Sequence, residues 1–565
     1  MRSIAFRYDE KRGCHRTPGE NWPCRDPRCG EGCPRQPQQS PPRPSGILTQ
    51  HAVANPHHLS AEAARHILDA GGNAVDAAVA GVAAQGVVAP ETCGVGGDMF
   101  TLIHQPGWSA PRALNSSGRA GSGTDPEELR RSGLAEIPTD HPMTVTVPGC
   151  VDGMTTLVND LGRLSLAKCL EPAIGLAREG FEVSTEQAFA FSLMAPVYVD
   201  NTAVSDFYPE GQAVSVGDVV QRSALAETLQ LVADDGRQGF YTGQPGHDIV
   251  DALGGAITSS DLDLNNAEWI DPIGCQVGGL TAWTTPPNSQ GYLAPATLAV
   301  FEMLAPPEDP NDPTWWHLLI EACRSLAWER NDVVADPGHA PLPPELLLDR
   351  ERLERTASTV DRDRAGVWPE AMGSESGTCY LCVSDADGMT VSMIQSNYRG
   401  TGSVFGAANS GFLLQDRGGG FSLMPGHPNE LGPGKRPLHT LSPTIWTEGP
   451  NPRWAIGSRG GAVQPQLVAQ IAARAVLGGA DLDSAQAAPR WTVREFGPGA
   501  GPRFEVEPGV SPDLLDDLRG RGHAIEELEE LQPGWGPISI IALDEEGPRA
   551  AADPRVDTAT ALTFP

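Results

Sequence analysis

The chain has 565 residues, with 72 acidic against 40 basic side chains and a formal net charge of -32. This charge argues against binding to nucleic acid or to anionic membrane surfaces, because the electrostatic field of the chain repels both. The 40% of hydrophobic residues and the 64 glycines are typical of a globular, turn-rich protein and exclude a disordered one. No stretch after residue 46 has the composition of an interdomain linker, so we expect one large folded unit.

Residues 1–45 are rich in Pro, Arg and Gln, and we expect a disordered extension. Their four cysteines, at positions 14, 24, 29 and 33, lack the paired short spacing of a zinc site. The whole chain has 11 cysteines, an odd number without a disulfide framework, which favours a reducing compartment. No export signal opens the sequence and no apolar run reaches membrane-spanning length. We therefore expect a cytoplasmic protein.

The first two thirds of the chain are predicted to be mostly helical. Helices are predicted at 60–71, with Ser60 as N-cap and Gly71 as C-cap, and at 73–85. Short strands are expected at 101–103 and 113–116. Apolar residues then recur with helical spacing at 166–179, 223–235 and 314–329. A strand at 277–283 is predicted to lead into a turn at 286–291.

Strands dominate after residue 377. Two β-rich runs, 378–383 and 389–396, are joined by the turn Asp-Ala-Asp-Gly at 385–388, a pattern that predicts a hairpin. Further strands are expected at 411–415, 444–446, 453–456 and 538–543, and helices at 464–477 and 513–520. This periodicity predicts an α+β fold with two sheets and flanking helices.

The predicted hairpin places two hydroxyl groups side by side. With the turn centred near residue 387, Thr378 faces Ser396 or a neighbour of it. A threonine hydroxyl becomes a useful nucleophile when a base lies within reach, and its own free α-amine is one such base. Cutting the Gly377–Thr378 bond would create that amine, and Gly377 permits the strained geometry that the cut requires. The alternative is that Thr378 is an ordinary β-branched strand residue.

The rest of the chain decides between these alternatives. Eight short segments occur in order, at 71–78, 94–98, 147–149, 239–243, 286–291, 433–437, 441–444 and 460–461. In this order they resemble the γ-glutamyltranspeptidase (glutathione hydrolase) family of N-terminal-nucleophile hydrolases. The resemblance covers the chain from about Gly46 to the C-terminus.

This resemblance implies a fold and a catalytic apparatus. The implied fold is a four-layer αββα sandwich. The implied maturation is an autocatalytic cut between Gly377 and Thr378, which yields a large subunit, 46–377, and a small subunit, 378–565. Gly460 and Gly461 would form the oxyanion hole, since their amides lie before a predicted helix. Ser396 would orient the nucleophile, in a place where the family has threonine. Neither a metal nor an organic cofactor is implied.

The positions that would bind substrate depart from the family pattern. The family holds the substrate ammonium with an asparagine, a glutamine or glutamate, and an aspartate; here the matching positions are Tyr398, Arg417 and Gly420. The positively charged Arg417 thus stands at a position where the family binds the positively charged ammonium of its substrate. We therefore predict a substrate with a second anionic group and no free α-ammonium, since arginine forks match carboxylates and repel ammonium.

The binding of the substrate α-carboxylate is also altered. The family's paired serines are replaced by His439 and Thr440, and Arg459 precedes the predicted oxyanion glycines. The family's arginine matches Ser117, so Arg119, two residues later, is the candidate for its role; the alternative is an exposed loop arginine. The predicted substrate-binding residues are Arg119, Tyr398, Arg417, His439, Thr440 and Arg459.

The sequence thus predicts a self-processing γ-glutamyltransferase-like amide hydrolase that acts on a small molecule. Two alternatives stay open. One is a hydrolase of a small anionic amide, oxamate-like or a β-lactam side chain; the other is an unprocessed, inactive binding relative. A redox role for Cys379 and Cys382 is set aside, because residues three apart on a strand point to opposite faces. His57 and His58 are expected to be surface histidines.

Overall fold

The computed structural model describes residues 50–369, 377–494 and 501–565. The predicted extension with its four cysteines lies outside the described residues, and residues 46–565 form one compact unit. Within these described residues, no helix is both long and apolar enough to cross a bilayer.

The nucleophile candidate lies at the start of a strand in the middle of a seven-stranded antiparallel sheet. Its strand order is β20-β1-β9-β10-β2-β3-β6. The strands are β1 (His51–Asn55), β2 (Asp98–His104), β3 (Arg112–Ser116), β6 (Glu268–Ile270), β9 (Cys379–Ser384), β10 (Thr390–Ser396) and β20 (Thr560–Phe564).

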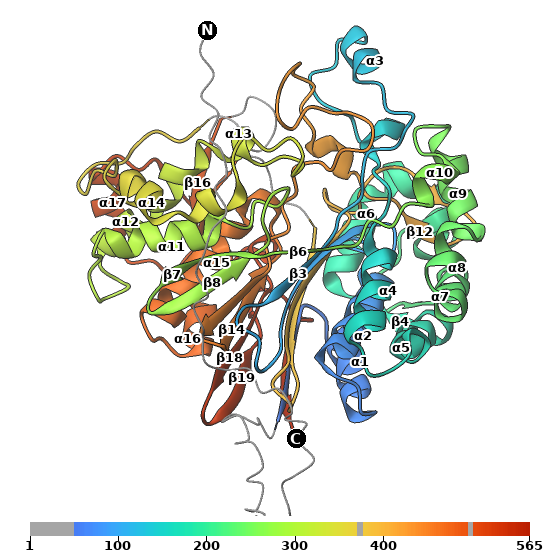
Figure 1. Cartoon of the computed structure of the whole chain (residues 1–565), viewed down its shortest axis with the longest axis horizontal. Helices are drawn as coiled ribbons and strands as arrows, with labels where there is room; N and C mark the ends of the chain where they lie inside the picture. Colours follow the sequence, from blue (N-terminus) through green and yellow to red (C-terminus); the bar gives the residue numbers. More distant parts are fainter. Residues whose placement is uncertain (1–49, 370–376, 495–500) are drawn as a thin grey trace, which may run out of the picture. The chain divides into compact units, whose positions relative to one another are not determined.

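A second antiparallel sheet of six strands packs against the first (Figure 1). Its order is β19-β18-β14-β13-β8-β7. The strands are β7 (Ile273–Val277), β8 (Leu280–Thr284), β13 (Thr444–Glu448), β14 (Asn451–Ser458), β18 (Ile538–Asp544) and β19 (Gly547–Ala551). Phe100, Tyr380 and Ile394 from the first sheet and Ile445 and Ile541 from the second share the apolar layer between them.

Helices cover the outer face of each sheet, on opposite sides of the pair (Figure 1). On the seven-stranded sheet lie α1 (His58–Asp69), α2 (Ala74–Val88), α4 (Cys150–Leu161), α5 (Leu166–Glu179), α6 (Thr185–Tyr198), α7 (Ser223–Asp235), α8 (Arg237–Tyr241) and α9 (Gln244–Leu253). On the six-stranded sheet lie α11 (Leu293–Met303), α12 (Pro313–Ala327), α14 (Arg350–Ala357), α15 (Gln464–Ala472) and α17 (Pro512–Gly520). These four layers confirm the predicted αββα sandwich.

The remaining elements are short. They are α3 (Pro126–Arg131), α10 (Ser259–Leu262), α13 (Arg330–Val333), α16 (Leu482–Ala487), and the strand groups β4 (Phe181–Glu182) with β5 (Val219–Val220), β11 (Gly406–Ala407) with β12 (Phe412–Leu413), and β15 (Trp491–Arg494) with β16 (Arg503–Val506) and β17 (Ile525–Glu527).

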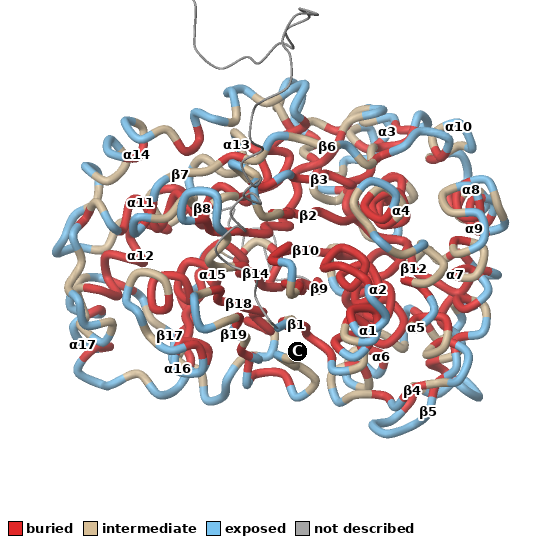
Figure 2. The backbone as a smooth tube through the Cα atoms, turned by 60° about the horizontal axis from the view of Figure 1, so that its bottom comes forward, coloured by how far each residue is buried: buried red, intermediate tan, exposed pale blue. Residues whose placement is uncertain are grey.

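Burial follows the layers. Helix α2 is buried along its whole length, as Figure 2 shows, and so are the central strands β9 and β10. Small residues dominate α2. Because short side chains let two backbones approach each other, the helix packs closely on β9. The sheet that carries the nucleophile candidate is therefore held rigidly from both faces.

The predicted hairpin is confirmed in position and register. β9 and β10 pair with Cys379 opposite Gln395, so the next positions outward, Thr378 and Ser396, face each other. At the turn, Asp385 Oδ1 accepts the amides of Asp387 (3.0 Å) and Met389 (2.9 Å). Gly388 takes a φ of 87°, a conformation that glycine adopts without strain.

The two cysteines of β9 lie on opposite faces of the sheet, as expected. Cys379 belongs to the core under the helices and Cys382 to the core between the sheets. Both are buried free thiols.

Three local predictions were wrong. Residues 277–283 are not one strand: Gly278 and Gly279, with φ of 58° and 79°, turn the chain between β7 and β8. The first helix begins at His58, and its N-cap is His57, whose side chain accepts the amide of Leu59. Ser60 is instead buried within the helix and donates to Gly81 O at 2.5 Å. His57 is therefore a buried capping residue and not a surface histidine.

Candidate active site

Three oxygen atoms meet at the start of β9. Thr378 Oγ1 donates to the carbonyl oxygen of Gly377 at 2.6 Å. Ser396 Oγ donates to the same carbonyl oxygen at 2.8 Å and lies 3.3 Å from Thr378 Oγ1. Thr378 is 1% exposed and Ser396 is fully buried. The Ser396 hydroxyl thus contacts both the Thr378 hydroxyl and the Gly377 carbonyl oxygen and holds the two close together.

This arrangement suits attack on the Gly377 carbonyl. A hydrogen bond from Ser396 draws electron density toward the oxygen, which is where negative charge grows in the transition state. Ser396 Oγ in turn accepts the amide of Tyr398 at 2.8 Å, which fixes its proton on the Gly377 side. A Cβ on Gly377 would lie 3.0 Å from Glu91 O and 3.1 Å from Gly400 Cα, so glycine fits this crowded position best.

The predicted oxyanion glycines follow the end of β14. Gly457, near that end, packs directly on Tyr380: a Cβ there would lie 2.2 Å from the ring. Tyr380 is two residues after Thr378, and Gly460 is three residues after Gly457. Gly460 and Gly461 take φ of 120° and 55° and lead into a short turn before α15. The structure thus brings the pair to the same end of the two sheets as Thr378, and their oxyanion role stays a prediction.

A cleft of about 350 Å³ opens at Gly377. Its polar lining includes Glu91, Glu186, Arg399 and Arg459, and its apolar lining comes from α6. Arg459 is 5% exposed; its guanidinium pairs with Glu186 Oε1 at 2.5 Å and donates to Pro533 O at 2.7 Å. Arg459 therefore lies at the site, as predicted from its position before the glycine pair.

The guanidinium of Arg417 is fully buried and keeps donors that make no hydrogen bond to the described residues. Its Nη1 donates to Thr440 Oγ1 at 3.0 Å, whereas Nε and Nη2 have no hydrogen-bond partner among the described residues. The guanidinium lies 4.0 Å from the centre of the Tyr398 ring. Burial lowers the pKa of Arg417 to about 10, although Asp98 and Asp416 oppose this shift. Such a group is suited to receive an anion.

Tyr398 connects this guanidinium to Ser396, which lies beside the candidate nucleophile. Its amide bonds Ser396 Oγ, and its ring packs on Arg417. Tyr398 also has a φ of 81°, an uncommon conformation for a bulky residue that is strained and often found at functional sites. The structure therefore brings together the predicted residues Tyr398, Arg417 and Thr440.

His439 has a different setting from the one predicted. Its Nε2 lies 3.2 Å from Asp98 Oδ2, and its Nδ1 accepts the amide of Leu441 at 3.4 Å. Burial and the nearby Arg417 and Arg436 lower the pKa of His439 well below its usual value, so the ring is neutral and donates through Nε2. Both ring nitrogens are already bonded, which leaves none for a substrate. His439 is better described as a structural link than as a binding residue.

Arg119 also lies in another setting. Its guanidinium pairs with Glu268 at 2.8 Å and with Asp336 at 3.6 Å, and it donates to Gly434 O at 3.1 Å. Arg436 joins the same cluster through Glu268. Because these partners already occupy the guanidinium, the structure does not support the prediction that Arg119 grips a substrate carboxylate.

Sequence reasoning missed two polar groups at the site. Gln290 donates to Thr440 O (3.2 Å) and Gly461 O (3.0 Å) and accepts from Arg330 Nε at 2.6 Å; its segment, 286–291, was noticed only as part of the resemblance. Glu91 is 6% exposed and lines the cleft beside Gly377. No motif marks a lone glutamate, so only the fold reveals it.

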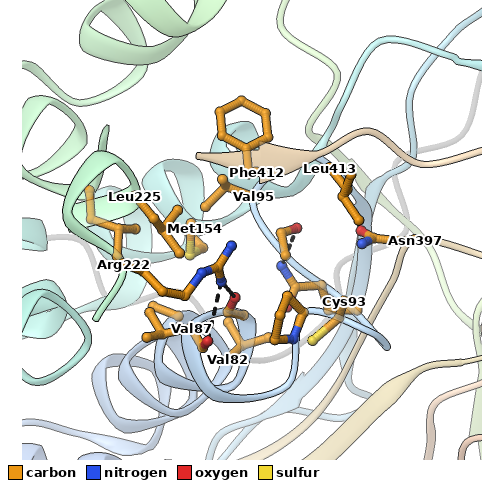
Figure 3. A pocket seen from close by; sticks show the side chains of 16 residues that line it. Val82, Val87, Cys93, Val95, Met154, Arg222, Leu225, Asn397, Phe412 and Leu413 are labelled. Carbon is orange, nitrogen blue, oxygen red and sulfur yellow. Dashed lines mark hydrogen bonds between the residues drawn. The ribbon is translucent and has the colours of Figure 1, made fainter. Parts of the chain in front are cut away.

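A separate interior pocket lies behind the 91–97 segment (Figure 3). Its volume is about 10 Å³, and its lining is mainly apolar, with Val82, Met154 and Phe412. The Arg222 guanidinium enters it but donates to Gly86 O at 2.9 Å and Val87 O at 3.2 Å. Arg222 thus fastens α2 to its neighbours, and this pocket is too small for a substrate.

Comparisons with known proteins identify relatives along most of the chain. The family model described as Gamma-glutamyltranspeptidase matches residues 60–563. The chain is 35% identical to a glutathione hydrolase-like proenzyme of Bacillus subtilis, over 91% of this chain and 99% of that protein. It is 33% identical to an oxamate amidohydrolase proenzyme of Klebsiella pneumoniae, over 92% and 99%. The crystal structure of a cephalosporin acylase from Bacillus halodurans superposes with a TM-score of 0.84, at 31% identity, covering 93% of this chain and 98% of that one.

The sandwich and its relatives define the class of protein: an N-terminal-nucleophile hydrolase, an enzyme that hydrolyses amides or transfers their acyl groups. Within that class, the chain belongs to the γ-glutamyltranspeptidase family.

Proposed function

We propose that the protein cuts itself between Gly377 and Thr378 and then uses Thr378 to hydrolyse an amide through an acyl-enzyme. The observation that carries this proposal is the placement of two hydroxyls, those of Thr378 and Ser396, on the Gly377 carbonyl oxygen. The proenzyme names of the relatives support the cut.

The proposed self-cleavage is a transfer followed by hydrolysis. Thr378 Oγ1 forms a bond to the Gly377 carbonyl carbon, the C–N bond breaks, and the nitrogen takes up the hydroxyl proton. Water then splits the resulting ester into a Gly377 carboxylate and a free Thr378 hydroxyl. The new α-amine, with an ordinary pKa of about 7.7–8.0, serves as the base for later turnovers, a contribution of about 10²–10⁴-fold in rate.

In each later turnover the substrate amide replaces the Gly377 carbonyl as the target of Thr378. The hydroxyl proton passes by way of the α-amine to the leaving nitrogen, and the acyl group stays on Thr378 until water releases it as a carboxylate. The amides of Gly460 and Gly461 are proposed to hold the charged oxygen of both steps. The cytoplasmic location, the division into subunits 46–377 and 378–565, and the choice between water and an amine as acceptor remain predictions.

For the substrate we propose a small amide whose acyl part carries a carboxylate and no ammonium. Arg417 supports this choice, because two of its N–H-bearing nitrogens have no partner among the described residues. Asp98 and Asp416 lie near this guanidinium, but its unbonded nitrogens are costly to bury, and a substrate carboxylate would accept from them. The second candidate is a γ-glutamyl amide such as glutathione, which the name of the Bacillus subtilis relative favours.

One experiment tests both parts. Intact mass spectrometry of the purified protein is expected to show two chains, the smaller beginning at Thr378. Parallel assays should then show faster turnover of glutaryl p-nitroanilide than of γ-glutamyl p-nitroanilide, which differs only by the α-ammonium. A single chain that still hydrolyses amides would refute the mechanism. Faster turnover of the γ-glutamyl substrate would refute the choice of substrate. A single, inactive chain would identify the protein as a binding relative.

A further inference from the structure

Helix α6 presents an apolar face to solvent beside the nucleophile. Phe189, Leu193 and Val197 recur at intervals of four residues and are 69%, 66% and 46% exposed. Residues four apart lie on one side of a helix, so the three form a continuous stripe, which we call the α6 stripe. Exposed apolar groups gathered in this way mark a binding surface more often than scattered ones do.

The first part of the α6 stripe lines the cleft at Gly377. Phe189, Ala190, Leu193 and Met194 form its apolar lining, or wall, and Arg399, Arg459 and Gly377 line the same cleft. Val197, at the other end of the stripe, is not part of the cleft lining. The wall is fixed in place because Glu186, in the first turn of α6, pairs with Arg459.

We propose that this wall binds the amine side of the substrate, so that the enzyme prefers amides of apolar or aromatic amines. The inference rests on the proposed function. Arg417 is fully buried and packs on the ring of Tyr398, whose amide bonds Ser396 Oγ, and the proposed function assigns it to the acyl carboxylate. The attacked carbonyl lies at Gly377, and the open cleft with its apolar wall remains for the leaving amine. The substrate class is thus an amide that joins a carboxylate-bearing acyl group to an apolar amine.

Two amides with the same acyl group test this inference. Glutaryl anilide and glutaryl methylamide are compared by the release of glutarate, in the wild type and in Phe189→Ser. Removing the ring contact should lower kcat/KM for the anilide about tenfold, the usual scale of selectivity in an apolar pocket, and leave the methylamide nearly unchanged. Val197→Ser is the matched control: same helix face, outside the cleft, with no expected change.

Other results would overturn the proposal. Equal losses for both amides in Phe189→Ser, or no loss in either, would exclude an amine-binding wall. If sedimentation shows that Phe189→Ser and Val197→Ser both convert a dimer to a monomer, the occupant of the α6 stripe is a second copy of the chain. Failure of the proposed function is recognised separately, because wild-type protein would then release no glutarate from either amide. In that case γ-glutamyl anilide and methylamide replace the pair, and the same criteria apply.

A second inference comes from an independent observation at Glu91. A cavity of about 10 Å³, room for about one water, lies between Glu91, Thr378, Gln85 and Arg459. Three polar atoms of its lining residues, Glu91 Oε2, Gln85 Oε1 and Arg459 Nε, are buried without a hydrogen-bond partner among the described residues. Buried polar groups are almost always satisfied, so the cavity is built for a polar occupant.

We infer that Glu91 accepts the Thr378 hydroxyl proton during self-cleavage, relayed by one water in this cavity. The proton moves from Oγ1 to the water while the water gives a proton to the Glu91 carboxylate. As the C–N bond breaks, the same path returns a proton to the Thr378 nitrogen. No proton is gained or lost, and Glu91 is a close neighbour of Gly377, since a Cβ added to Gly377 would lie 3.0 Å from the Glu91 carbonyl oxygen.

The charges around Glu91 set the pH at which it can act. Burial and Glu186 raise the pKa of Glu91 to about 8, against the opposing effect of Arg459 and Arg222. His57, which lines the same cavity, is uncharged near neutral pH, since burial and His58 lower its pKa to about 3. Only the carboxylate can take a proton, so self-cleavage should quicken as pH rises through about 8 and then level off.

Freshly translated full-length chain tests this inference. Cell-free synthesis is stopped, the pH is shifted to values from about 6 to 9, and conversion to two chains is followed on denaturing gels. Glu91→Gln should slow conversion about a hundredfold, within the range for lost acid–base catalysis, and flatten its pH dependence, whereas Glu91→Asp should keep the rise with pH. A wild-type rate and profile in Glu91→Gln would overturn the inference. So would an equal loss at every pH in both variants, which indicates a structural role.

Discussion

Replacing Thr378 with alanine is expected to leave one uncut chain of 59.7 kDa without amidase activity. The variant loses the hydroxyl that is proposed to attack Gly377, while Ser396 Oγ keeps its bonds to the carbonyl oxygen and the Tyr398 amide. Loss of a covalent nucleophile typically costs about 10⁶-fold in rate. Intact mass spectrometry and amide assays measure both effects on the same preparation.

Two matched variants separate the nucleophile from its surroundings. Thr378→Ser keeps the hydroxyl and should still yield two chains, more slowly, because serine rotates more freely than a β-branched residue. Ser396→Ala removes the donor to the Gly377 oxygen and should slow cleavage about 10²–10³-fold, the cost of one oxyanion donor. Activity that survives in a Thr378→Ala chain would mean that another residue performs the attack.

Replacing Arg417 with methionine should remove the preference for an acyl carboxylate. Methionine keeps most of the apolar contact with Tyr398 and loses the charge. A hydrogen bond to a charged group contributes about 1.5–3 kcal/mol, so kcat/KM for glutaryl p-nitroanilide should fall about 10–100-fold. Self-cleavage should persist, because Gly377 carries no side chain for Arg417 to bind.

The control for Arg417 is an arginine of similar length away from the site. Arg453 pairs with Glu448 on the surface at the β13–β14 turn, and Arg453→Met should leave both anilide activities unchanged. An Arg417→Met enzyme that still prefers the glutaryl substrate would show that the carboxylate binds elsewhere, with Arg459 as the next residue to test.

The sequence predicted the elements whose signals are local. Helices α5 and α7 have the predicted bounds, because apolar periodicity reports local structure directly. The turn predicted the register of β9 with β10 and placed Thr378 opposite Ser396 or a neighbour of it, and the observed register selects Ser396. The pairing of the two hydroxyls was therefore predictable from a single hairpin, whereas the proposed role of Thr378 came from the resemblance along the rest of the chain.

What the sequence could not predict depends on long-range packing. The Arg119 side chain is held by Glu268 and Asp336, far along the chain, and no local pattern records such partners. His439 is neutral because folding buries it near Arg417 and Arg436, which lowers its pKa. Glu91 is likewise an ordinary acidic residue until the fold encloses it next to Gly377. Charge and burial at these positions belong to the tertiary structure.

The strand order bears on what becomes of the two halves once the proposed scission has occurred. In the nucleophile's sheet, β1 from the first half is inserted between β20 and β9 from the second, and β10 borders β2. In the other sheet, β13 from the second half adjoins β8 from the first. Neither fragment could dissociate without breaking the backbone hydrogen bonds along several strand pairs. The mature enzyme would then be a permanently interwoven heterodimer that denaturants, and not dilution, take apart.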